Sequence, residues 1–320
     1  MRVLVTGMGG ELGTRMAQLL EERDEVDEIF GVDFVPPRRR LRRSAFRRID
    51  PRDRDKLAAF VTEVAPQAVA HYGVYEPDSR LNQFDAREFT EACTVTVLGA
   101  AARAGSLERV VVRSGLEVYG RGPRFPLVPD EDAPLAPTTP YGRSVLEVET
   151  MAAALVRRLG IPVASLRLAP VLGSHVPSPL GRLLRLPAVP VPALTDPSFQ
   201  LLHQEDAAHA MVEALLRSVD GPLNIVGDGA VSAWQVVRLG GRVPVPMMGP
   251  LWTFARQVAE VAGAPVPPHV LELIRLGRAG DASRARDALG PRPLQSTLDV
   301  CTELYEWGTV TPLRRGEQAA

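Results

Sequence analysis

The sequence predicts an α/β protein, a doubly wound parallel sheet with a smaller C-terminal lobe. Short apolar runs alternate with longer helical patterns through the first half of the 320-residue chain, which is typical of a parallel sheet covered by helices. A glycine-rich turn joins the first apolar run to the first helical pattern. Beyond Leu168 the alternation gives way to a proline-rich segment. That change indicates a second structural unit.

The alternation assigns the elements of the main sheet one by one. Predicted strands cover Val3–Thr6, Glu28–Val32, Phe46–Ile49, Ala68–Tyr72, Arg109–Arg113 and Val163–Leu168. Predicted helices cover Leu12–Glu22, Asp53–Val64, Arg87–Ala104 and Thr139–Leu159. Ligands of such sheets bind beyond the carboxyl ends of the strands, where the strand order reverses. Functional residues are therefore expected at those strand ends.

The second half of the chain is less regular. Residues 170–200 are proline-rich and predict irregular structure. Further on, the pattern predicts a helix at Leu202–Arg217, a returning strand at Leu223–Val226, and amphipathic helices at Leu251–Ala262 and His269–Arg278. We therefore expect a main domain at 1–168, to which 200–228 return, and a substrate-binding lobe at 169–199 and 229–320.

Composition excludes several classes of protein. Apolar residues make up 45% of the chain, enough for a sizeable core, and the net charge of −1 favours neither nucleic acid nor an anionic membrane. No apolar run approaches the length of a membrane span. Cys93 and Cys301 lack metal-site spacing, and no secretory leader is evident, so a reduced, cytoplasmic protein is expected. His175, His209 and His269 are scattered, so no metal site is predicted.

The glycine-rich turn predicts a dinucleotide site. It reads Gly7-Met8-Gly9-Gly10-Glu11-Leu12-Gly13, follows a predicted strand and opens a predicted helix. Glycines at this spacing permit a tight turn and let the backbone approach a pyrophosphate, which the amides of the helix N-terminus can bind. The flanking strand and helix supply the context that such a motif needs.

Asp33 and Asp50 extend this site along the next two strand ends. Asp33 closes the second predicted strand, where a carboxylate can accept hydrogen bonds from both hydroxyls of the adenosine ribose. Its charge favours NAD over NADP, although the arginines at 38–40 leave NADP open. Asp50, after Ile49, could accept from the adenine amino group or cap the following helix.

A second motif lies at the start of the fourth predicted helix. Residues 137–145 read Pro-Thr-Thr-Pro-Tyr-Gly-Arg-Ser-Val, which has the outline of a catalytic Tyr-x-x-x-Lys helix around Tyr141. Val145 stands where the lysine is expected. Lys56 is the only lysine in the chain, so no neighbouring lysine replaces it.

Together these motifs resemble the extended short-chain dehydrogenase/reductase family, the NAD-dependent epimerase/dehydratase group. The likeness covers most of the chain and implies a Rossmann domain. It rests on ordered segments at 6–13 with Asp33, 49–50, 118–120, 137–144, 167–173, 199–207, 223–227 and 281–290. In that family the two helices predicted at 87–104 and 139–159 pair across a dimer, so the resemblance implies a homodimer.

The resemblance implies roles for several residues. Tyr141 matches the tyrosine that transfers a proton, whereas the substrate-orienting Ser or Thr falls on Gly115, with Ser114 one residue earlier. Glu117 matches the glutamate that acts as base in the sugar-dehydratase branch, and a solvated loop residue is its alternative. His71, Tyr72 and Gly73 match the turn beside the cofactor, and core packing explains the first two equally well.

Loss of the lysine affects oxidation more than reduction. A tyrosine base at neutral pH needs its pKa lowered by roughly 3 units, worth about 4 kcal/mol. Arg143 lies two positions from Tyr141, on the opposite helix face. Arg113 is a better candidate for a compensating cation, with a structural role as its alternative. A neutral Tyr141 could still protonate a developing alkoxide during reduction.

Three functional hypotheses follow. The first is an atypical NAD-dependent oxidoreductase or epimerase that acts on a small polar carbonyl or sugar-like substrate, with Tyr141 as proton donor. The second is a redox-silent dinucleotide-binding sensor or scaffold. The third is a lyase or isomerase that uses Tyr141 and Glu117 without net redox change. The aromatic and methionine side chains of the smaller lobe could line its pocket or form an ordinary core: Trp234, Met247, Met248, Trp252 and Phe254.

Overall fold

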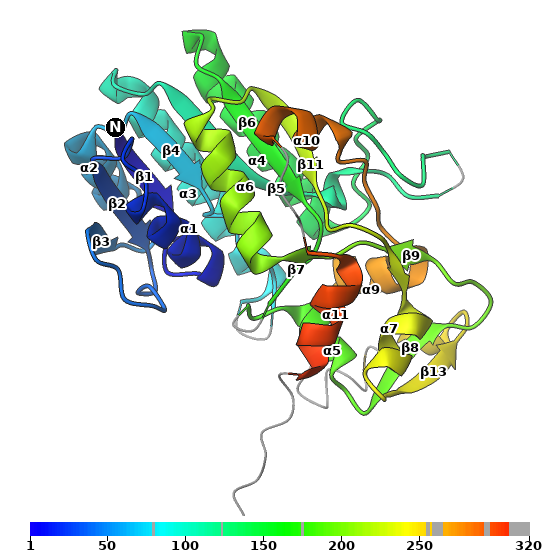
Figure 1. Cartoon of the computed structure of the whole chain (residues 1–320). Coiled ribbons are helices and arrows are strands. Elements are labelled where there is room, and N and C mark those ends of the chain that lie inside the picture. The colour runs from blue at the N-terminus through cyan, green and yellow to red at the C-terminus, as the bar shows by residue number, and fades with distance from the viewer. Residues whose placement is uncertain are drawn as a thin grey trace, which may run out of the picture.

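A parallel sheet forms the centre of the molecule (Figure 1). The computed structural model describes residues 1–78, 81–122, 124–173, 176–253, 257, 265–290 and 295–306. The sheet has seven strands in the order β11-β6-β5-β4-β1-β2-β3, and all neighbours are parallel. The strands are β1 (Arg2–Thr6), β2 (Glu28–Asp33), β3 (Ser44–Arg48), β4 (Ala68–His71), β5 (Arg109–Gly115), β6 (Val163–Leu168) and β11 (Gly221–Ile225). The predicted doubly wound fold is confirmed. Strand order reverses between β1 and β4, where a ligand is expected.

Helices cover both faces of the sheet. α1 (Glu11–Glu21) and α6 (Gln204–Leu216) pack together on one face, and the other carries α2 (Arg54–Val64), α3 (Gln83–Ala104) and α4 (Pro140–Val156). α3 begins four residues before its predicted start at Arg87. The Asn82 side chain explains this difference, because it caps the helix by accepting from the amides of Phe84 and Asp85, each at 2.9 Å.

The smaller lobe has its own apolar core and lies to one side of the sheet's carboxyl edge (Figure 1). A parallel pair of strands, β8 (Ala188–Pro192) and β13 (Val243–Met247), lies there. Its helices are α5 (Pro179–Leu184), α7 (Ala233–Leu239), α9 (Pro268–Leu276) and α11 (Thr297–Glu306). Short pieces complete the chain: η1 (Leu116–Val118), η2 (Arg157–Leu159), β7 (Val171–Leu172), β9 (Ser198–Phe199), β10 (Leu202–His203) and β12 (Val231–Ser232). The proline-rich segment is thus more ordered than its composition predicts.

One C-terminal helix departs from the expected division of the chain. α10 (Ser283–Leu289) packs against β11 and α6, and Ala282 and Ala285 belong to the core of the main domain. The chain therefore returns to the large domain a second time, within the range expected to form only the smaller lobe. Most of the helix predicted at Leu251–Ala262 lies outside the described residues.

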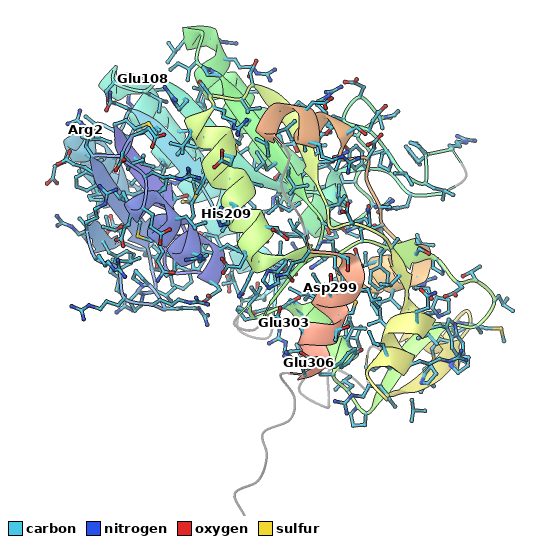
Figure 2. The ribbon with its side chains drawn as sticks, viewed as in Figure 1. Arg2, Glu108, His209, Asp299, Glu303 and Glu306 are labelled. Atoms are coloured by element: carbon cyan, nitrogen blue, oxygen red, sulfur yellow. The ribbon has the colours of Figure 1, made fainter. Side chains whose placement is uncertain are left out.

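A histidine joins the last described helix to the main domain. His203 caps α6, where its Nδ1 accepts from the Glu205 amide at 3.3 Å. Its Nε2 lies 3.1 Å from a carboxylate oxygen of Glu303 on α11. Figure 2 labels Glu303 between Asp299 and Glu306 on that helix. No helix in the described part of the chain is long and apolar enough to cross a membrane.

Candidate active site between the two lobes

The glycine turn after β1 has the geometry of a dinucleotide cradle. Gly7 has a φ of +67°, and a Cβ there would lie 2.7 Å from the carbonyl oxygen of Tyr72. A Cβ on Gly9 would lie 2.0 Å from the Val35 carbonyl oxygen, and one on Gly13 would lie 2.2 Å from that of Gly7. Only glycine allows these backbone approaches. Gly10 caps α1 without a side-chain hydrogen bond, so the first amides of α1 remain available to a phosphate.

Asp33 joins this turn to the end of β2. Its carboxylate accepts from the amides of Gly9 at 3.0 Å and Phe34 at 2.7 Å, and from the Tyr75 hydroxyl at 3.3 Å. The side chain lines the pocket and is only 3% exposed. Burial raises its pKa to about 6, although these hydrogen bonds act to lower it. Because a carboxylate offers about four lone-pair sites, these three hydrogen bonds leave capacity for about one ribose hydroxyl.

The neighbouring arginines are partly engaged elsewhere. Arg39 pairs with Glu11 at 2.5 Å, and the Glu11 side chain is only 3% exposed. Glu11 and Leu12 both line the pocket at the first turn of α1. The cation that could rescue NADP binding is therefore already neutralised at this position.

Asp50 makes a local ion pair. It receives two hydrogen bonds from Arg52, Nε to Oδ1 at 3.0 Å and Nη2 to Oδ2 at 2.7 Å, and these lower its pKa. The cap of α2 is Asp53, which accepts from the Lys56 amide, so the capping alternative for Asp50 is wrong. Ile49 is buried in the core. Neither Ile49 nor Asp50 is among the described residues that line the pocket.

Of the three residues predicted to lie beside the cofactor at the end of β4, one lines the pocket. Tyr72 lines it and is 5% exposed. His71 instead lies in the core with its ring nitrogens 2.8 Å from Thr6 Oγ1 and 2.9 Å from Thr94 Oγ1. Burial lowers the pKa of His71 to about 4, so the ring is neutral at physiological pH. Gly73 is packed tightly, since a Cβ there would lie 2.5 Å from the Cys93 sulfur.

Tyr141 faces a guanidinium. Thr139 caps α4 by accepting from the Gly142 amide at 3.1 Å, which places Tyr141 in the first turn of the helix. Arg113, near the end of β5, lies with Nη2 3.4 Å from the Tyr141 hydroxyl and donates from Nη1 to the Val74 carbonyl at 3.1 Å. Burial raises the pKa of Tyr141, and Arg113 opposes that rise. Arg143 is exposed.

The positions at which the resemblance implies a lysine and a substrate-orienting serine or threonine have other surroundings. Val145 is 1% exposed and belongs to the main core. Ser114 lines the pocket, but its hydroxyl donates to Glu149, whose carboxylate also pairs with Arg167 at 2.9 Å. At Gly115 a Cβ would lie 2.3 Å from Glu117 Oε2. The Glu117 carboxylate therefore fills the space that a serine side chain at this position would need.

Glu117 is held in a buried ion pair. Arg278, which has no exposed side-chain surface, contacts the Glu117 carboxylate and also pairs with Glu272 at 2.6 Å. Burial alone would raise the pKa of Glu117, but Arg278 and His269 outweigh it and the pKa is lowered. Glu117 lines the pocket as an ionised carboxylate, which makes it a weak base.

The smaller lobe brings further residues to the pocket. His269 of α9 stacks on Tyr141 with ring centroids 4.6 Å apart, and its Nε2 lies 2.9 Å from Glu76 Oε1. Sequence reasoning passed over this pair, because 193 positions separate the two residues. Apolar side chains complete this end of the pocket: Val171, Val176, Pro177, Leu180, Val270 and Leu273.

The aromatic residues of the smaller lobe are core residues where they are described. Trp252 lies in the smaller core, Trp234 and Met247 pack against it, and Met248 is exposed. Phe254 and His175 lie outside the described residues. No group of acidic, histidine and cysteine side chains suited to a metal ion occurs in the part of the chain that the structure describes.

Several known proteins resemble this chain. The sequence model of the NAD dependent epimerase/dehydratase family matches residues 3–226. An uncharacterized protein of Mycobacterium tuberculosis is 29% identical over 97% of this chain and 85% of its own length. UDP-glucose 4-epimerase of Streptomyces lividans is 25% identical over 97% of each chain. The structure of UDP-glucuronic acid 4-epimerase from Bacillus cereus, in complex with UDP-glucuronic acid and NAD, has a TM-score of 0.73 at 19% identity, over 96% of this chain and 98% of that one.

Proposed function

Because the chain belongs to the NAD-dependent epimerase/dehydratase family, we propose that it is an oxidoreductase or epimerase for a small polar carbonyl or sugar-like substrate. One observation carries the proposal. Tyr141 and Arg113 line the same pocket as the glycine turn and Asp33. A proton donor with a cationic neighbour thus shares a cavity with a dinucleotide cradle. The NAD dependence of the family agrees with the cofactor predicted from the sequence.

The residues present fit NAD. The amides that open α1 would bind the pyrophosphate, and Asp33 would accept from the adenosine ribose. Asp33 also disfavours the 2′-phosphate of NADP, because a buried carboxylate next to a phosphate costs electrostatic energy. When bound, NAD accepts a hydride from the substrate or returns one to it.

Tyr141 acts as a neutral acid. Its pKa is raised by burial, so the phenol keeps its proton at neutral pH and can donate it to a carbonyl oxygen that is being reduced. Arg113 would stabilise the phenolate that forms as the proton leaves, since an adjacent cation favours the charged form. This is the part of the lysine's role that a guanidinium at 3.4 Å can take over.

The first test separates cofactor binding from chemistry. NAD binding is measured by calorimetry, and turnover by nicotinamide absorbance and product analysis with UDP-glucose, UDP-glucuronic acid and small hydroxyketones. We expect Tyr141→Phe to abolish turnover with NAD binding unchanged. Arg113→Met should lower kcat by about 10- to 100-fold, as loss of a hydrogen bond from a charged group implies. Arg143→Met is the matched control, because that arginine is exposed.

Other outcomes would point elsewhere. Full turnover by Tyr141→Phe contradicts the assignment. NAD binding without hydride exchange on any substrate favours the redox-silent sensor or scaffold, for which the buried Val145 is the motivating observation. Substrate conversion that does not require NAD favours the lyase or isomerase. The ion pair of Glu117 with Arg278 weighs against the last of these, since it weakens the intended base.

The proposed assembly is a homodimer through α3 and α4. These helices pack side by side on one face of the sheet, and Arg87 of α3 pairs with Glu147 of α4 at 3.0 Å. The outer face of α3 carries exposed Phe84 and Val95. Such apolar side chains on a regular helical surface suit a twofold contact.

A further inference from the structure

His269 has an unusual environment for a buried histidine. The residue is 4% exposed and lines the pocket next to Tyr141. Its Nε2 lies 2.9 Å from Glu76 Oε1. Its Nδ1 is buried and has no hydrogen-bond partner among the described residues. A buried polar atom without a partner is costly, so a ligand atom in the pocket is its natural partner.

The contact with Glu76 fixes the tautomer of the neutral ring. An ionised carboxylate only accepts hydrogen bonds, so Nε2 must carry the proton. Nδ1 then holds a free lone pair. A carboxylate that orients an imidazole and stabilises its protonated form is the arrangement that makes histidine an effective base. Glu76 extends from the segment after β4 and His269 from α9, so the pair forms only when the two lobes meet.

Other groups around His269 do not supply a base. Tyr141 has a raised pKa and keeps its proton, and Glu117 is neutralised by Arg278. Arg113 and Arg278 are cations and have no lone pair to offer. Among the described residues that line the pocket, the Tyr72 hydroxyl and Nδ1 of His269 are both buried without a partner. Burial raises the pKa of Tyr72, so its phenol keeps its proton, and Nδ1 is the better proton acceptor of the two.

We propose that His269 is the general base of this enzyme and that Glu76 is its positioning residue. The proposal rests on the proposed oxidoreductase function and names the proton acceptor at that site. When a substrate alcohol is oxidised, its hydroxyl proton would pass to the Tyr141 oxygen as the Tyr141 proton moves to Nδ1 of His269. The hydrogen on the adjacent carbon would leave with its electron pair to NAD, and a carbonyl forms. In the reverse direction Tyr141 donates its proton to the carbonyl oxygen, and the imidazolium of His269 restores the proton of Tyr141.

The first experiment needs no substrate. Histidine NMR of the isotope-labelled, NAD-loaded protein reports the tautomer of each ring, and the signal missing in His269→Gln assigns His269. We expect the neutral ring to carry its proton on Nε2. We also expect Glu76→Ala to weaken this preference, because the carboxylate that accepts the Nε2 proton is then gone. A proton on Nδ1, or a tautomer preference that Glu76→Ala leaves unchanged, would overturn the proposal.

The second experiment uses the substrate that the turnover panel identifies. Loss of a general base costs about 10²- to 10⁴-fold in kcat, and we expect His269→Gln to show such a loss with unchanged NAD binding. Added imidazole should restore part of the lost kcat of His269→Gln, because a free base can then take the proton. The matched control is His209→Gln, on α6 in the main domain (Figure 2).

The two experiments separate this proposal from the function on which it rests. If NAD fails to bind, or if Tyr141→Phe turns over normally, the proposed function fails. If those tests succeed and His269→Gln keeps the wild-type kcat, only the assignment of the base fails. A merely structural His269 would lower thermal stability in the variant, and imidazole would not restore its activity.

Discussion

At the scale of single residues, the cation beside Tyr141 comes from a strand and not from the helix that carries Tyr141. The helix position at which the sequence resemblance implies a lysine holds Val145, which packs in the main core. The cation reaches Tyr141 from β5 instead, through Arg113. A guanidinium keeps its charge at all ordinary pH values and has no proton to give up. It can therefore stabilise the phenolate of Tyr141, but it cannot relay a proton as a lysine ammonium can.

Asp33 is the residue whose protonation most affects cofactor binding. Its pKa is raised to about 6 by burial, whereas an aspartate in the unfolded chain titrates near 3.9. Between these values the folded protein holds a proton that the unfolded chain has released. Its contribution to the free energy of unfolding therefore falls as the pH rises through this window, and it is constant above pH 6.

The same titration predicts a pH dependence of NAD affinity. The ionised Asp33 is the better acceptor for a ribose hydroxyl, so we expect the Kd for NAD to rise as the pH falls through about 6. Calorimetry across this range gives the measurement. Asp33→Asn should bind NAD more weakly at neutral pH and lose this dependence. The same slope in wild type and variant would mean that another group is responsible.

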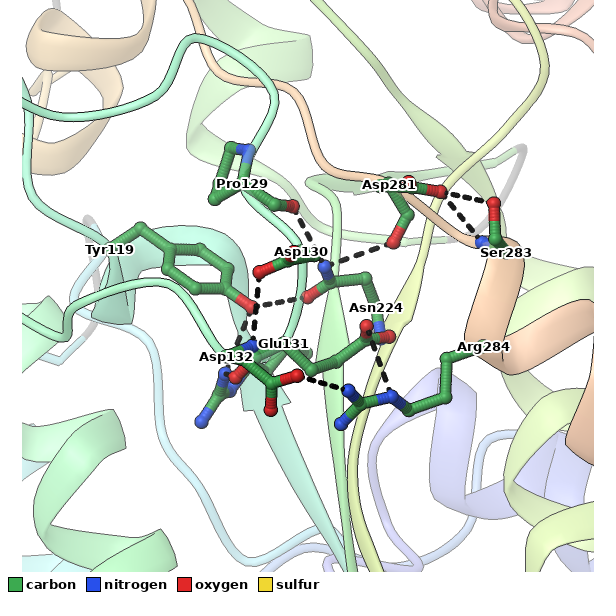
Figure 3. A network of polar contacts seen from close by, with 10 residues as sticks. Tyr119, Pro129, Asp130, Glu131, Asp132, Asn224, Asp281, Ser283 and Arg284 are labelled. Carbon is green, nitrogen blue, oxygen red and sulfur yellow. Dashed lines mark hydrogen bonds and ion pairs between the residues drawn. The ribbon is translucent and has the colours of Figure 1, made fainter.

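At the scale of elements, a buried polar network attaches α10 and the loop before it to the sheet (Figure 3). Asn224 of β11 is at its centre and is fully buried. Its side chain donates to the carbonyls of Pro129 at 3.1 Å and Asp281 at 3.0 Å, and accepts from the Tyr119 hydroxyl at 2.7 Å. Its amide donates to Glu131 at 2.7 Å. One asparagine thus joins segments that are far apart in the sequence.

This network predicts unequal effects of two substitutions. Asn224→Ala leaves buried groups unpaired and should lower the free energy of unfolding by about 1–3 kcal/mol. Asp132 pairs with Arg284 at 2.6 Å, but these side chains are 77% and 43% exposed, so Asp132→Asn should cost less than about 1 kcal/mol. Urea unfolding of both variants gives the comparison. Equal losses would show that Asn224 does not hold the network together.

Local patterns predicted the central elements, but not the contacts between distant ones. Strand and helix alternation located β1, β2, β4, β5 and β6 because these strands are short and mostly buried. β3 is largely exposed and begins at Ser44, two residues before the predicted start at Phe46. The glycine turn and Asp33 were found because their chemistry depends on neighbours in sequence. His269 and Glu76 were missed because their contact depends on how α9 docks against the main domain, which no local pattern encodes. Only the placement of both lobes brings them together.

At the scale of the whole molecule, the pocket belongs to both lobes. The main domain supplies the cradle, Tyr141 and Arg113, whereas α5 and α9 of the smaller lobe supply Leu180, Val270 and His269. Movement between the lobes would therefore change the distance between His269 and Glu76. Substrate binding that holds the lobes together would keep this pair in contact and exclude water, which strengthens electrostatic interactions in the site.

Assembly of two chains would leave this pocket free while covering α3 and α4. The outward stripe of α3 holds Phe84, Glu88, Glu91 and Val95 at helical spacing, and Phe84 is 76% exposed. We expect a dimer by light scattering after size-exclusion chromatography. Val95→Glu should shift it toward monomer, because a twofold contact buries the new charge twice.

The matched control for the dimer is Leu239→Glu on α7, in the smaller lobe. Leu239 is 46% exposed, comparable with the 36% of Val95, so the two changes place a similar charge on a similar apolar site. A monomeric wild type, or a dimer that only Leu239→Glu dissociates, would contradict the predicted interface. The outer face of α3 and α4 is separate from the carboxyl edge of the sheet, where the cofactor cradle lies. We therefore expect Val95→Glu to give a monomer that still binds NAD, which would show that dimerisation through α3 and α4 is independent of the cradle.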